Sequence, residues 1–473
     1  MEKYDLTIIG GGSGGLTAAR IATSLGANVL LVDKERLGGD CLNYGCVPSK
    51  SLIHVARVVQ EAKQAARFGL MPADLGVDMA KVSQYVQGVI ARVAESEKAY
   101  TEGVTVKFGQ VAFKSATKLI LNDEMISSRD TIVATGSHPA NPPIEGLAEV
   151  GYLTNEDVFD LLHMPVSMIV IGGGPIGVEL GQAFERLGAK VTIIQGPERL
   201  LPREDPEVSS MIADILTAEG ITIVTNARCV KVRRNGDKKV VIAKIDNQPV
   251  PFEADEIVLA LGRQPNVDGL QLENAGVKYD AKGIKVDEYL QTATPNVLAI
   301  GDVIGGYLFT HVAAYQAGVA VRNALVPFGK KKVDYRVVPW CTFTDPEAAR
   351  VGMTPEEASQ AHNGQIRIVK VPWAEIDRAQ AEGETEGFIK LVLAGKKDEI
   401  VGAHMVGARA GEMLGELSLA MQHNLTLNDI LATIHAYPTM NTGLQQTVFD
   451  AYLEGEATTR NRKIVRTVLN FRR

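Results

Sequence analysis

The sequence predicts an α/β fold with two similar halves and a further C-terminal region. A glycine-rich turn between a strand-like run and a helix-like run occurs twice, and the 473 residues suffice for about three domains. The composition, with 45% hydrophobic and 22% charged residues, is typical of a packed globular protein. The formal net charge of −7 argues against general nucleic-acid binding, which requires a positive surface.

The start of the chain predicts a cytoplasmic protein. A strand-like run at residues 6–9 begins almost at once, without the apolar core of a signal peptide. No run approaches the roughly 18 apolar residues of a membrane span, so we expect no membrane contact. The chain contains only Cys41, Cys46, Cys229 and Cys341, which is too few for a disulfide scaffold, so a pair among them is expected to be catalytic.

The first glycine-rich turn has the spacing of a dinucleotide-binding turn. Gly10, Gly12 and Gly15 separate the first strand from a helix-like stretch at 16–25. In such a turn the first glycine makes the bend, the second admits a pyrophosphate, and the third lets helix and strand pack closely. Asp33, which ends the next strand-like run, is placed to hydrogen-bond a ribose 2′-hydroxyl.

The same layout returns at Gly172, Gly174 and Gly177. The last glycine lies 18 positions before the ribose position in both copies. The second ribose position is Gln195, which would not repel the 2′-phosphate of NADPH, and Arg199 could pair with that phosphate, although a solvated surface charge is the alternative. The repeat predicts two Rossmann-like dinucleotide-binding domains, the second of which favours NADPH, with NADH kept open.

A cysteine pair follows the first ribose position. Cys41 and Cys46 are five positions apart, and Gly45 permits the chain between them to bend back so that the sulfurs can meet. Neither a CxxC spacing nor a nearby histidine supports a metal site. Because Gly39 and Lys50 flank the cysteines in one segment, we favour a redox pair over two unrelated thiols.

The segment GGDCLNYGCVPSK at residues 38–50 resembles the active site of the pyridine nucleotide–disulfide oxidoreductases, a family that includes lipoamide dehydrogenase, glutathione reductase and mercuric reductase. Similar segments follow along nearly the whole chain: ATGSHP at 134–139, ALGRQPN at 260–266, AIGDV at 299–303 and FTDPE at 343–347. The resemblance implies FAD as a cofactor, NAD(P)H as the reductant and a homodimer.

The resemblance also implies roles for individual residues. Cys46 would face the flavin as a charge-transfer thiolate, and Cys41 would exchange with substrate. Lys50 would place its ammonium near the flavin, with Glu179 as its acidic partner. The other cofactor contacts that the resemblance implies are Gly39, Val111 (by its backbone, at the adenine), Thr135, Gly136, Ser137, Asp302 (at the ribityl chain), His311 and, for the nicotinamide nucleotide, Gly262.

The expected substrate end departs from part of this family. Lipoamide dehydrogenases and glutathione reductases carry a histidine directly before a proline, with a glutamate five residues later, and this imidazole transfers protons. Here Tyr437 and Thr442 occupy those positions, while His435 matches a non-catalytic histidine of lipoamide dehydrogenases. A phenol with an ordinary pKa of about 10 is a poor base at neutral pH, so dithiol exchange should be slow.

Mercuric reductases are more similar here, because they carry a tyrosine near this place. Tyr437 could then assist a soft metal held by the Cys41 and Cys46 thiolates, and in the homodimer it would complete the partner's site. A packing aromatic at the dimer seam is the alternative for Tyr437. The N-terminal metal-binding domain of mercuric reductases is not expected, and residues 437–473 contain no cysteine pair to deliver the metal.

The order of the motifs predicts the domain layout. Residues 1–147 and 271–335 form a split FAD-binding domain, 148–270 an inserted NAD(P)-binding domain, and 336–473 an α+β dimerisation domain. The split follows from the second glycine turn, which precedes a segment that resembles part of the FAD site.

The last domain is predicted to start with strands and to contain helices near 355–362 and 410–423. The charged residues at 459–463 are interpreted as solvated surface. Cys229 and Cys341 lie in strand-like runs and are interpreted as core thiols.

Three functions remain open on the sequence. The first is an FAD-dependent NAD(P)H oxidoreductase, similar to mercuric reductase, that passes electrons through a Cys41–Cys46 disulfide to a small disulfide, dithiol or soft-metal acceptor. The second is a dihydrolipoyl dehydrogenase that oxidises dihydrolipoamide with NAD⁺. The third is a flavoprotein sensor or complex subunit with little turnover, which the intact cysteine pair disfavours.

Overall fold

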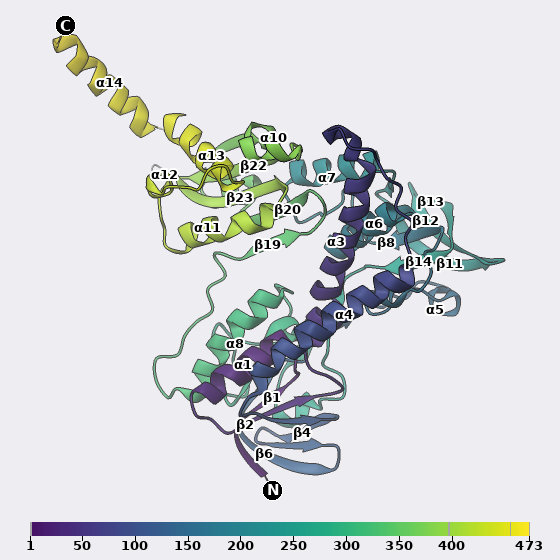
Figure 1. Cartoon of the computed structure of the whole chain (residues 1–473). Helices are drawn as coiled ribbons and strands as arrows, with labels where there is room; N and C mark the ends of the chain where they lie inside the picture. The colour runs from purple at the N-terminus through teal and green to yellow at the C-terminus, as the bar shows by residue number, and fades with distance from the viewer. Residues whose placement is uncertain (1, 396–397, 455, 473) are drawn as a thin grey trace. The chain divides into compact units, whose positions relative to one another are not determined.

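The computed structural model describes residues 2–395, 398–454 and 456–472, and Figure 1 follows the chain from end to end. Its internal contacts divide it into two compact units. The first unit comprises Met1–Gly172, Ala183–Ile194 and Arg228–Asp334. The second comprises Gly173–Gln182, Gln195–Ala227 and Tyr335–Arg473. Since residues 148–270 contribute to both units, the bounds of the NAD(P)-binding domain stay a prediction.

The main sheet of the first unit has the strand order β3-β2-β1-β6-β5-β4, with β18 also paired to β6. The pairs of β1, β2, β3, β6 and β18 are parallel, whereas β5 and β4 are antiparallel additions. The strands are β1 (Glu2–Ile9), β2 (Val29–Asp33), β3 (Thr105–Phe108), β4 (Val111–Ser115), β5 (Lys118–Leu121), β6 (Glu124–Val133) and β18 (Val297–Ala299).

This parallel arrangement brings distant parts of the chain to one edge. The carboxyl ends of parallel strands share an edge of the sheet, which is where such folds bind ligands. The end of β2, with Asp33, and the segments that follow β1, β6 and β18 therefore meet there; these segments contain Gly10, Ser137 and Asp302.

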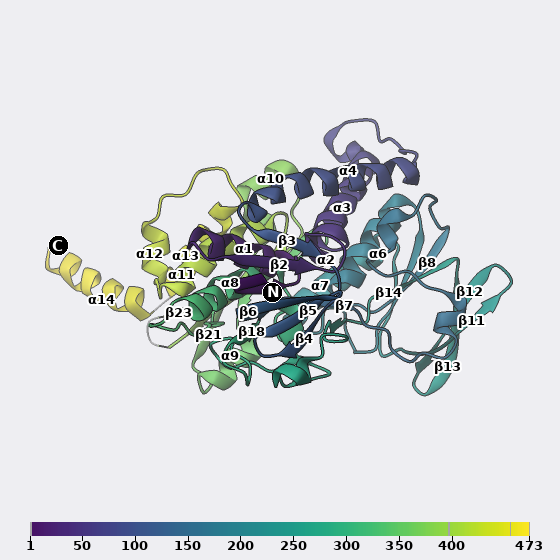
Figure 2. The ribbon, with the colours of Figure 1, turned by 90° about the horizontal axis from the view of Figure 1, so that it is seen from below.

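The sheet is packed on both faces. α1 (Ser13–Ser24) and α8 (Thr310–Leu325) lie side by side in both Figure 1 and Figure 2. Leu6 and Ile8 of β1 belong to the core that includes these helices, whereas Ile9 belongs to the core on the other face. The alternation is that of a strand buried on both faces.

The second glycine turn follows a smaller parallel sheet, β9-β8-β14, in the first unit. A three-stranded antiparallel sheet, β11-β12-β13, and a helical pair, α3 and α4, complete that unit's larger elements. Their bounds are α3 (Cys46–Lys63), α4 (Met79–Glu97), β8 (Ser167–Ile171), α6 (Pro175–Leu187), β9 (Lys190–Ile194), β11 (Arg228–Asn235), β12 (Lys238–Ile245), β13 (Gln248–Ala254) and β14 (Glu256–Leu259).

The second unit contains a five-stranded antiparallel sheet in the order β19-β20-β23-β22-β21. α11 packs on β20 and β23, and α13 packs on β21 and β22. The elements are α7 (Pro206–Ala218), β10 (Thr222–Val224), β19 (Pro339–Thr342), β20 (Glu347–Gly352), α9 (Pro355–Ala361), β21 (Ile366–Pro372), α10 (Asp377–Glu382), β22 (Phe388–Ala394), β23 (Glu399–Gly407), α11 (Ala410–Gln422), α12 (Leu427–Ala432), α13 (Asn441–Glu454) and α14 (Glu456–Phe471).

The α/β fold and the predicted elements are confirmed. The two helices expected near 355–362 and 410–423 are α9 and α11. Cys229 and Cys341 do lie in strands, and both are half-buried. The charged stretch at 459–463 belongs to α14, although the side chains of 459–461 lie outside the described ones. Among the described helices, none has both the length and the apolar character of a membrane span.

Candidate functional site

The structure brings the sulfurs of Cys41 and Cys46 together. Cys41 lies in α2 (Gly39–Asn43), and Cys46 is the first residue of α3. Between them the chain bends back so closely that a Cβ on Gly45 would lie 2.9 Å from an Asp40 carboxylate oxygen and 3.3 Å from the Cys41 Cα. A side-chain hydrogen bond joins the two cysteines. Glycine at position 45 avoids these close contacts, and the redox role of the pair stays a prediction.

The two thiols differ in their electrostatic surroundings. The hydrogen bond to Cys46, together with burial, raises the pKa of Cys41 well above its ordinary value. Cys46 lies at the N-terminus of α3, where the helix dipole favours a thiolate. In the chain by itself Cys46 is exposed and Cys41 is half-buried. The raised pKa of Cys41 disfavours its thiolate.

Thr310 is a site residue that sequence reasoning missed. Its Oγ1 lies 3.6 Å from Cys46 Sγ, and it is the first residue of α8. A second helix N-terminus thus lies beside the Cys46 sulfur. The available signal was its position directly before His311, a residue expected to contact a cofactor.

The first glycine turn fits the pyrophosphate of FAD. A Cβ on Gly15 would lie 1.8 Å from the Gly10 carbonyl oxygen, so the third glycine is needed for α1 to pack against the turn. Gly12 is the N-cap of α1 without a side-chain cap, and the closest neighbour of a Cβ there would be the Gly39 Cα at 3.6 Å. Uncapped N–H groups beside an open glycine backbone form a cradle for an anion, and these residues would hold the phosphates.

The second turn repeats this geometry. Gly172 has a φ of 118°, and a Cβ there would lie 2.2 Å from the Ala260 carbonyl oxygen, whereas no described atom lies within 4 Å of a Cβ on Gly174. α6 follows directly and contains Gly177. The turn therefore leaves its second glycine open in the same way as the first.

Both predicted ribose positions brace their own glycine turns. Asp33 Oδ2 accepts a hydrogen bond from the Gly11 N–H at 2.6 Å. Gln195 Oε1 accepts one from the Gly173 N–H at 2.8 Å, and its Nε2 donates to the Arg199 carbonyl oxygen at 3.2 Å. The two copies thus share an internal role that the sequence did not reveal, and their contact with a ribose stays a prediction.

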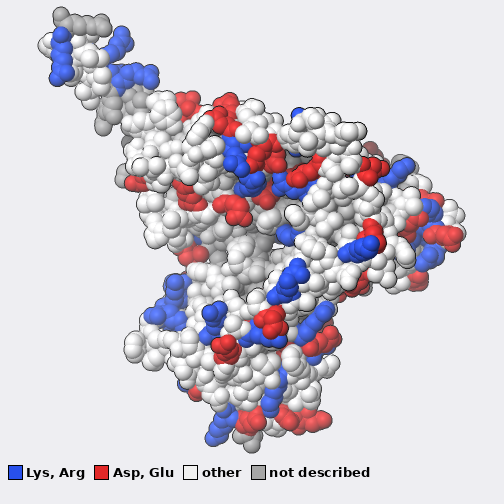
Figure 3. Space-filling view, in the orientation of Figure 1, with Lys and Arg blue, Asp and Glu red and all other residues white. Residues whose placement is uncertain are grey.

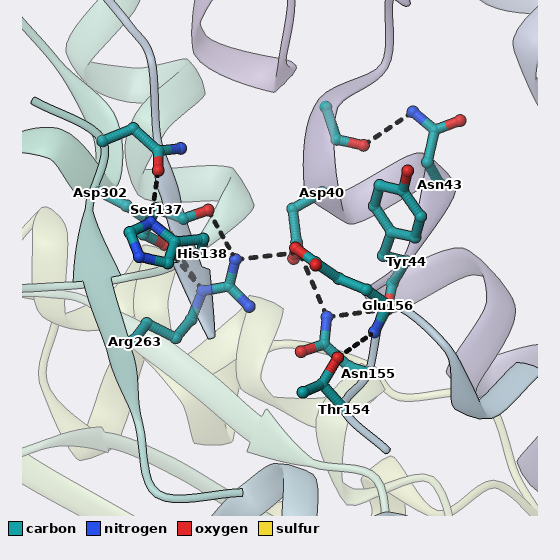
Figure 4. A network of polar contacts seen from close by, with 12 residues as sticks. Asp40, Asn43, Tyr44, Ser137, His138, Thr154, Asn155, Glu156, Arg263 and Asp302 are labelled. Atoms are coloured by element: carbon teal, nitrogen blue, oxygen red, sulfur yellow. Dashed lines mark hydrogen bonds and ion pairs between the residues drawn. The ribbon is translucent and has the colours of Figure 1, made fainter. Parts of the chain in front are cut away.

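A polar network joins Asp40, which directly precedes Cys41, to Asp302 (Figure 4). The Ser137 hydroxyl donates to Asp302 Oδ2 at 2.6 Å and accepts from Arg263 Nε at 2.7 Å. Arg263 Nη2 also lies 2.9 Å from Asp40 Oδ1. Burial raises the pKa of Asp302, and the Ser137 hydrogen bond and the nearby Arg263 oppose that rise.

Arg263 reaches this position through strand pairing. β15 (Arg263–Pro265) is antiparallel to β7 (Ser137–Pro139), which places the guanidinium beside Ser137. Arg263 belongs to the segment ALGRQPN, yet it was not among the predicted site residues. The signal that could have revealed it is a lone arginine within a glycine-containing turn expected at a cofactor.

Two asparagines hold the neighbouring segments. Asn155 Nδ2 donates to Asp40 Oδ1 at 3.2 Å and to the Tyr44 carbonyl oxygen at 3.1 Å (Figure 4). Asn266 Nδ2 donates to the Thr135 carbonyl oxygen at 2.8 Å, and the Asn266 backbone N–H donates to the Gly136 carbonyl oxygen. The segment after β6 is therefore fixed by side chains from distant parts of the chain.

The remaining predicted residues are placed as follows. Lys50 is half-buried one turn after Cys46 in α3, and the buried Glu179 accepts a hydrogen bond from the Phe343 N–H at 2.8 Å. Lys50 and Glu179 belong to different units, so their pairing stays a prediction. Val111 is buried in β4, Gly39 and Gly262 have φ values of 58° and 104°, and the His311 ring stacks on Phe309 with centroids 5.3 Å apart.

Tyr437 is held as a neutral phenol. Its hydroxyl donates to Asp377 Oδ2 at 2.8 Å, and this hydrogen bond to a carboxylate raises the pKa of the phenol. His435 Nε2 lies 2.9 Å from Glu416 Oε1, and its Nδ1 lies 3.0 Å from the Thr433 carbonyl oxygen. Both ring nitrogens of His435 therefore face acceptors within the chain.

Comparison with known proteins places these features in a family. The family described as "Pyridine nucleotide-disulphide oxidoreductase" matches residues 4–318, and its dimerisation domain matches residues 338–448. A mercuric reductase of Staphylococcus aureus is 36% identical over 448 residues, which cover 93% of this chain and 81% of the relative. A dihydrolipoyl dehydrogenase of Bacillus subtilis is 33% identical over 466 residues, which cover 95% of this chain and 98% of the relative.

A solved structure is also similar over nearly the whole chain. The Cu(II) complex of the HOCl-induced flavoprotein disulfide reductase RclA from Escherichia coli has a TM-score of 0.85 and 28% sequence identity. The match covers 95% of this chain and 99% of that one.

Proposed function

We propose that this chain, which belongs to the pyridine nucleotide-disulphide oxidoreductase family, passes electrons from NAD(P)H through Cys41 and Cys46 to a small disulfide or a soft metal ion. The observation that carries the proposal is the contact of the two thiols, with the pKa of Cys41 raised and Cys46 at a helix N-terminus. As an enzyme of this family it uses FAD and NAD(P)H. When bound, FAD supplies two-electron transfer between the nicotinamide and the cysteine pair.

The residues of the chain divide the work of thiol exchange. The Cys41 proton passes to the Cys46 thiolate along their hydrogen bond, and Cys41 then attacks a disulfide substrate. The substrate S–S bond breaks, a mixed disulfide forms, and the leaving thiolate takes up the proton from Cys46. Cys46 then attacks the Cys41 sulfur, which releases the second thiol and closes the Cys41–Cys46 disulfide. The helix N-termini at Cys46 and Thr310 stabilise the thiolate that makes this second attack.

The substrate end favours a soft metal over a dithiol. The raised pKa of Tyr437 keeps it protonated at neutral pH, so it is a poor base for thiol protons. A soft metal ion requires thiolate ligands, which Cys41 and Cys46 provide by releasing their two protons. The relatives support the same direction, since one is named mercuric reductase and another structure is a Cu(II) complex. In the homodimer, which the dimerisation domain supports, we propose that Tyr437 completes the partner subunit's site.

Dihydrolipoyl dehydrogenase is the second candidate, because such a relative aligns over 98% of its own length. An acceptor screen with mercuric ion, lipoamide, glutathione disulfide and small quinones separates the two. Fast NADH formation from NAD⁺ and dihydrolipoamide would favour the second candidate. Bound FAD and titratable thiols without NAD(P)H oxidation by any acceptor would instead favour a low-turnover flavoprotein.

The assignment of Cys46 is tested by absorbance spectroscopy. Limited NAD(P)H should produce a long-wavelength charge-transfer band in the yellow protein, and Cys46→Ser should abolish the band because the thiolate is lost. Cys41→Ser should retain it, and Cys229→Ser provides a control cysteine in β11. Persistence of the band in Cys46→Ser would refute the assignment.

A further inference from the structure

The last helix, α14 (Glu456–Phe471), lies beyond the residues that the family's dimerisation domain matches, which end at 448. Its side chains are described from Arg462 onward. The family resemblance therefore assigns no role to α14, and its surface has to be interpreted from its own residues.

One side of α14 is apolar and exposed. At 3.6 residues per turn, the apolar residues of 462–472 cover about half of the helix circumference. They are between 46% and 88% exposed, namely Ile464, Val465, Val468, Leu469 and Phe471. Five large apolar side chains that remain this exposed on one helix form a surface that calls for a partner.

The opposite side of α14 is cationic. Arg462, Lys463 and Arg466 share it with Thr467 and Asn470, and Arg472 follows the helix end. Residues 462–472 contain no carboxylate, although the whole chain has more acidic than basic residues. Figure 3 shows blue side chains on the coloured part of α14.

We propose that α14 binds the surface of an anionic lipid membrane, with its apolar side among the acyl chains and its cations at the headgroups. A helix with a wide apolar side and a Lys/Arg-rich polar side is the form that lies in the membrane interface. The apolar side is too wide for a two-stranded helix pair, which uses two positions of every seven, so a second copy of α14 is a poorer match. The expectation of no membrane contact rested on the lack of a spanning run, and a helix that lies in the membrane interface does not need one.

The acidic remainder of the chain gives the binding a direction. An anionic membrane surface repels a protein of net negative charge. It attracts Lys and Arg residues that lie close to it, and each of them strengthens binding about fivefold. The cationic helix is therefore the part that approaches the membrane. The attraction weakens with salt because mobile ions screen it.

The test is co-sedimentation of the full-length, FAD-loaded protein with lipid vesicles. Binding is expected to vesicles of equal parts phosphatidylglycerol and phosphatidylcholine, and it should fall as salt rises from about 0.05 to about 0.5 M. Leu469→Asn should weaken binding about tenfold or more, because a leucine loses its burial. Thr467→Asn is the matched control, since it places the same amide on the polar side, and it should change binding less than about twofold.

The outcomes separate this proposal from the proposed function. Both variants should oxidise NAD(P)H at the wild-type rate, because neither residue belongs to the redox site. The proposal would be overturned if the protein bound pure phosphatidylcholine vesicles as well as those with phosphatidylglycerol. It would also be overturned if Leu469→Asn and Thr467→Asn lost vesicle binding to the same extent. A change of oligomeric state by Leu469→Asn in analytical ultracentrifugation, without vesicle binding, would overturn it too and would identify a second copy as the partner.

Discussion

At the scale of single residues, the site depends on side chains that hold other side chains. Arg263 contacts Asp40, which directly precedes Cys41. It also donates to the Ser137 hydroxyl, which in turn donates to Asp302. The motifs name each of these segments, but the order of residues along a segment does not say which side chain meets which. For that reason Arg263 and Thr310 were missed, although Arg263 lies in the segment at 260–266 and Thr310 lies next to His311.

Tyr437 gives the first residue-scale prediction. Tyr437→His should raise the rate of dihydrolipoamide oxidation at least about tenfold, because an imidazole with an ordinary pKa accepts thiol protons near neutral pH and the Asp377-bound phenol does not. The gain should appear in kcat and follow the titration of a histidine in a pH–rate profile. Tyr437→Phe serves as the control and should bring no gain; an unchanged rate in Tyr437→His would contradict the proton-transfer argument.

Gln195 gives the second residue-scale prediction. We predict that the wild-type enzyme prefers NADPH and that Gln195→Glu lowers kcat/KM for NADPH at least about tenfold relative to NADH, since a carboxylate repels a 2′-phosphate. The ratio of the two kcat/KM values is the measurement, because bracing of Gly173 affects both nucleotides alike. A strong wild-type preference for NADH would be the contrary result.

At the scale of elements, each glycine turn connects a strand to the helix that follows it. The sequence predicts both strand–turn–helix units, and the structure has β1 with α1 and β8 with α6. The sequence also predicts close packing at Gly15 and a chain reversal at Gly45, and the structure identifies the atoms that lie close at each of these glycines.

Gly15→Ala tests the element scale. The new Cβ would meet the Gly10 carbonyl oxygen at 1.8 Å, so α1 has to move away from the turn, at a cost of about 3 kcal/mol of unfolding free energy. Thermal unfolding should shift down, and the purified protein should lose its yellow colour as FAD affinity falls. Gly76→Ala is a suitable control, because no described atom lies within 4 Å of a Cβ there; equal behaviour of the two variants would refute the close-packing argument.

At the scale of the whole molecule, charged side chains are also buried in the interior. In the second unit Lys390 is buried with Asp205, whose carboxylate oxygens both lie 2.9 Å from its Nζ. His404 is fully buried nearby, and its Nε2 lies 2.9 Å from the Met353 carbonyl oxygen. Burial lowers the pKa of His404 to about 4.

His404 predicts how stability depends on pH. The folded histidine stays neutral down to about pH 4, whereas the unfolded one takes up a proton below about pH 6.5, so unfolding binds a proton and becomes easier as pH falls between these values. The loss amounts to at most about 3 kcal/mol. This loss is measured by denaturant unfolding of the wild type and of His404→Gln at about pH 7.5, about pH 6 and about pH 5. The variant retains a donor for the carbonyl but does not titrate there, so equal slopes would contradict the assignment.

The sequence by itself determined the repeated glycine turns, the cysteine pair and the α/β class, because each is encoded in a short stretch of chain whose spacing fixes its local geometry. Only the tertiary structure decided that Asp40, Ser137, Arg263 and Asp302 form one network. These residues come from distant parts of the chain, and parallel strands bring the segments after β6 and β18 to the same edge of the sheet. Local periodicity specifies an element, but the pairing of strands specifies which elements become neighbours.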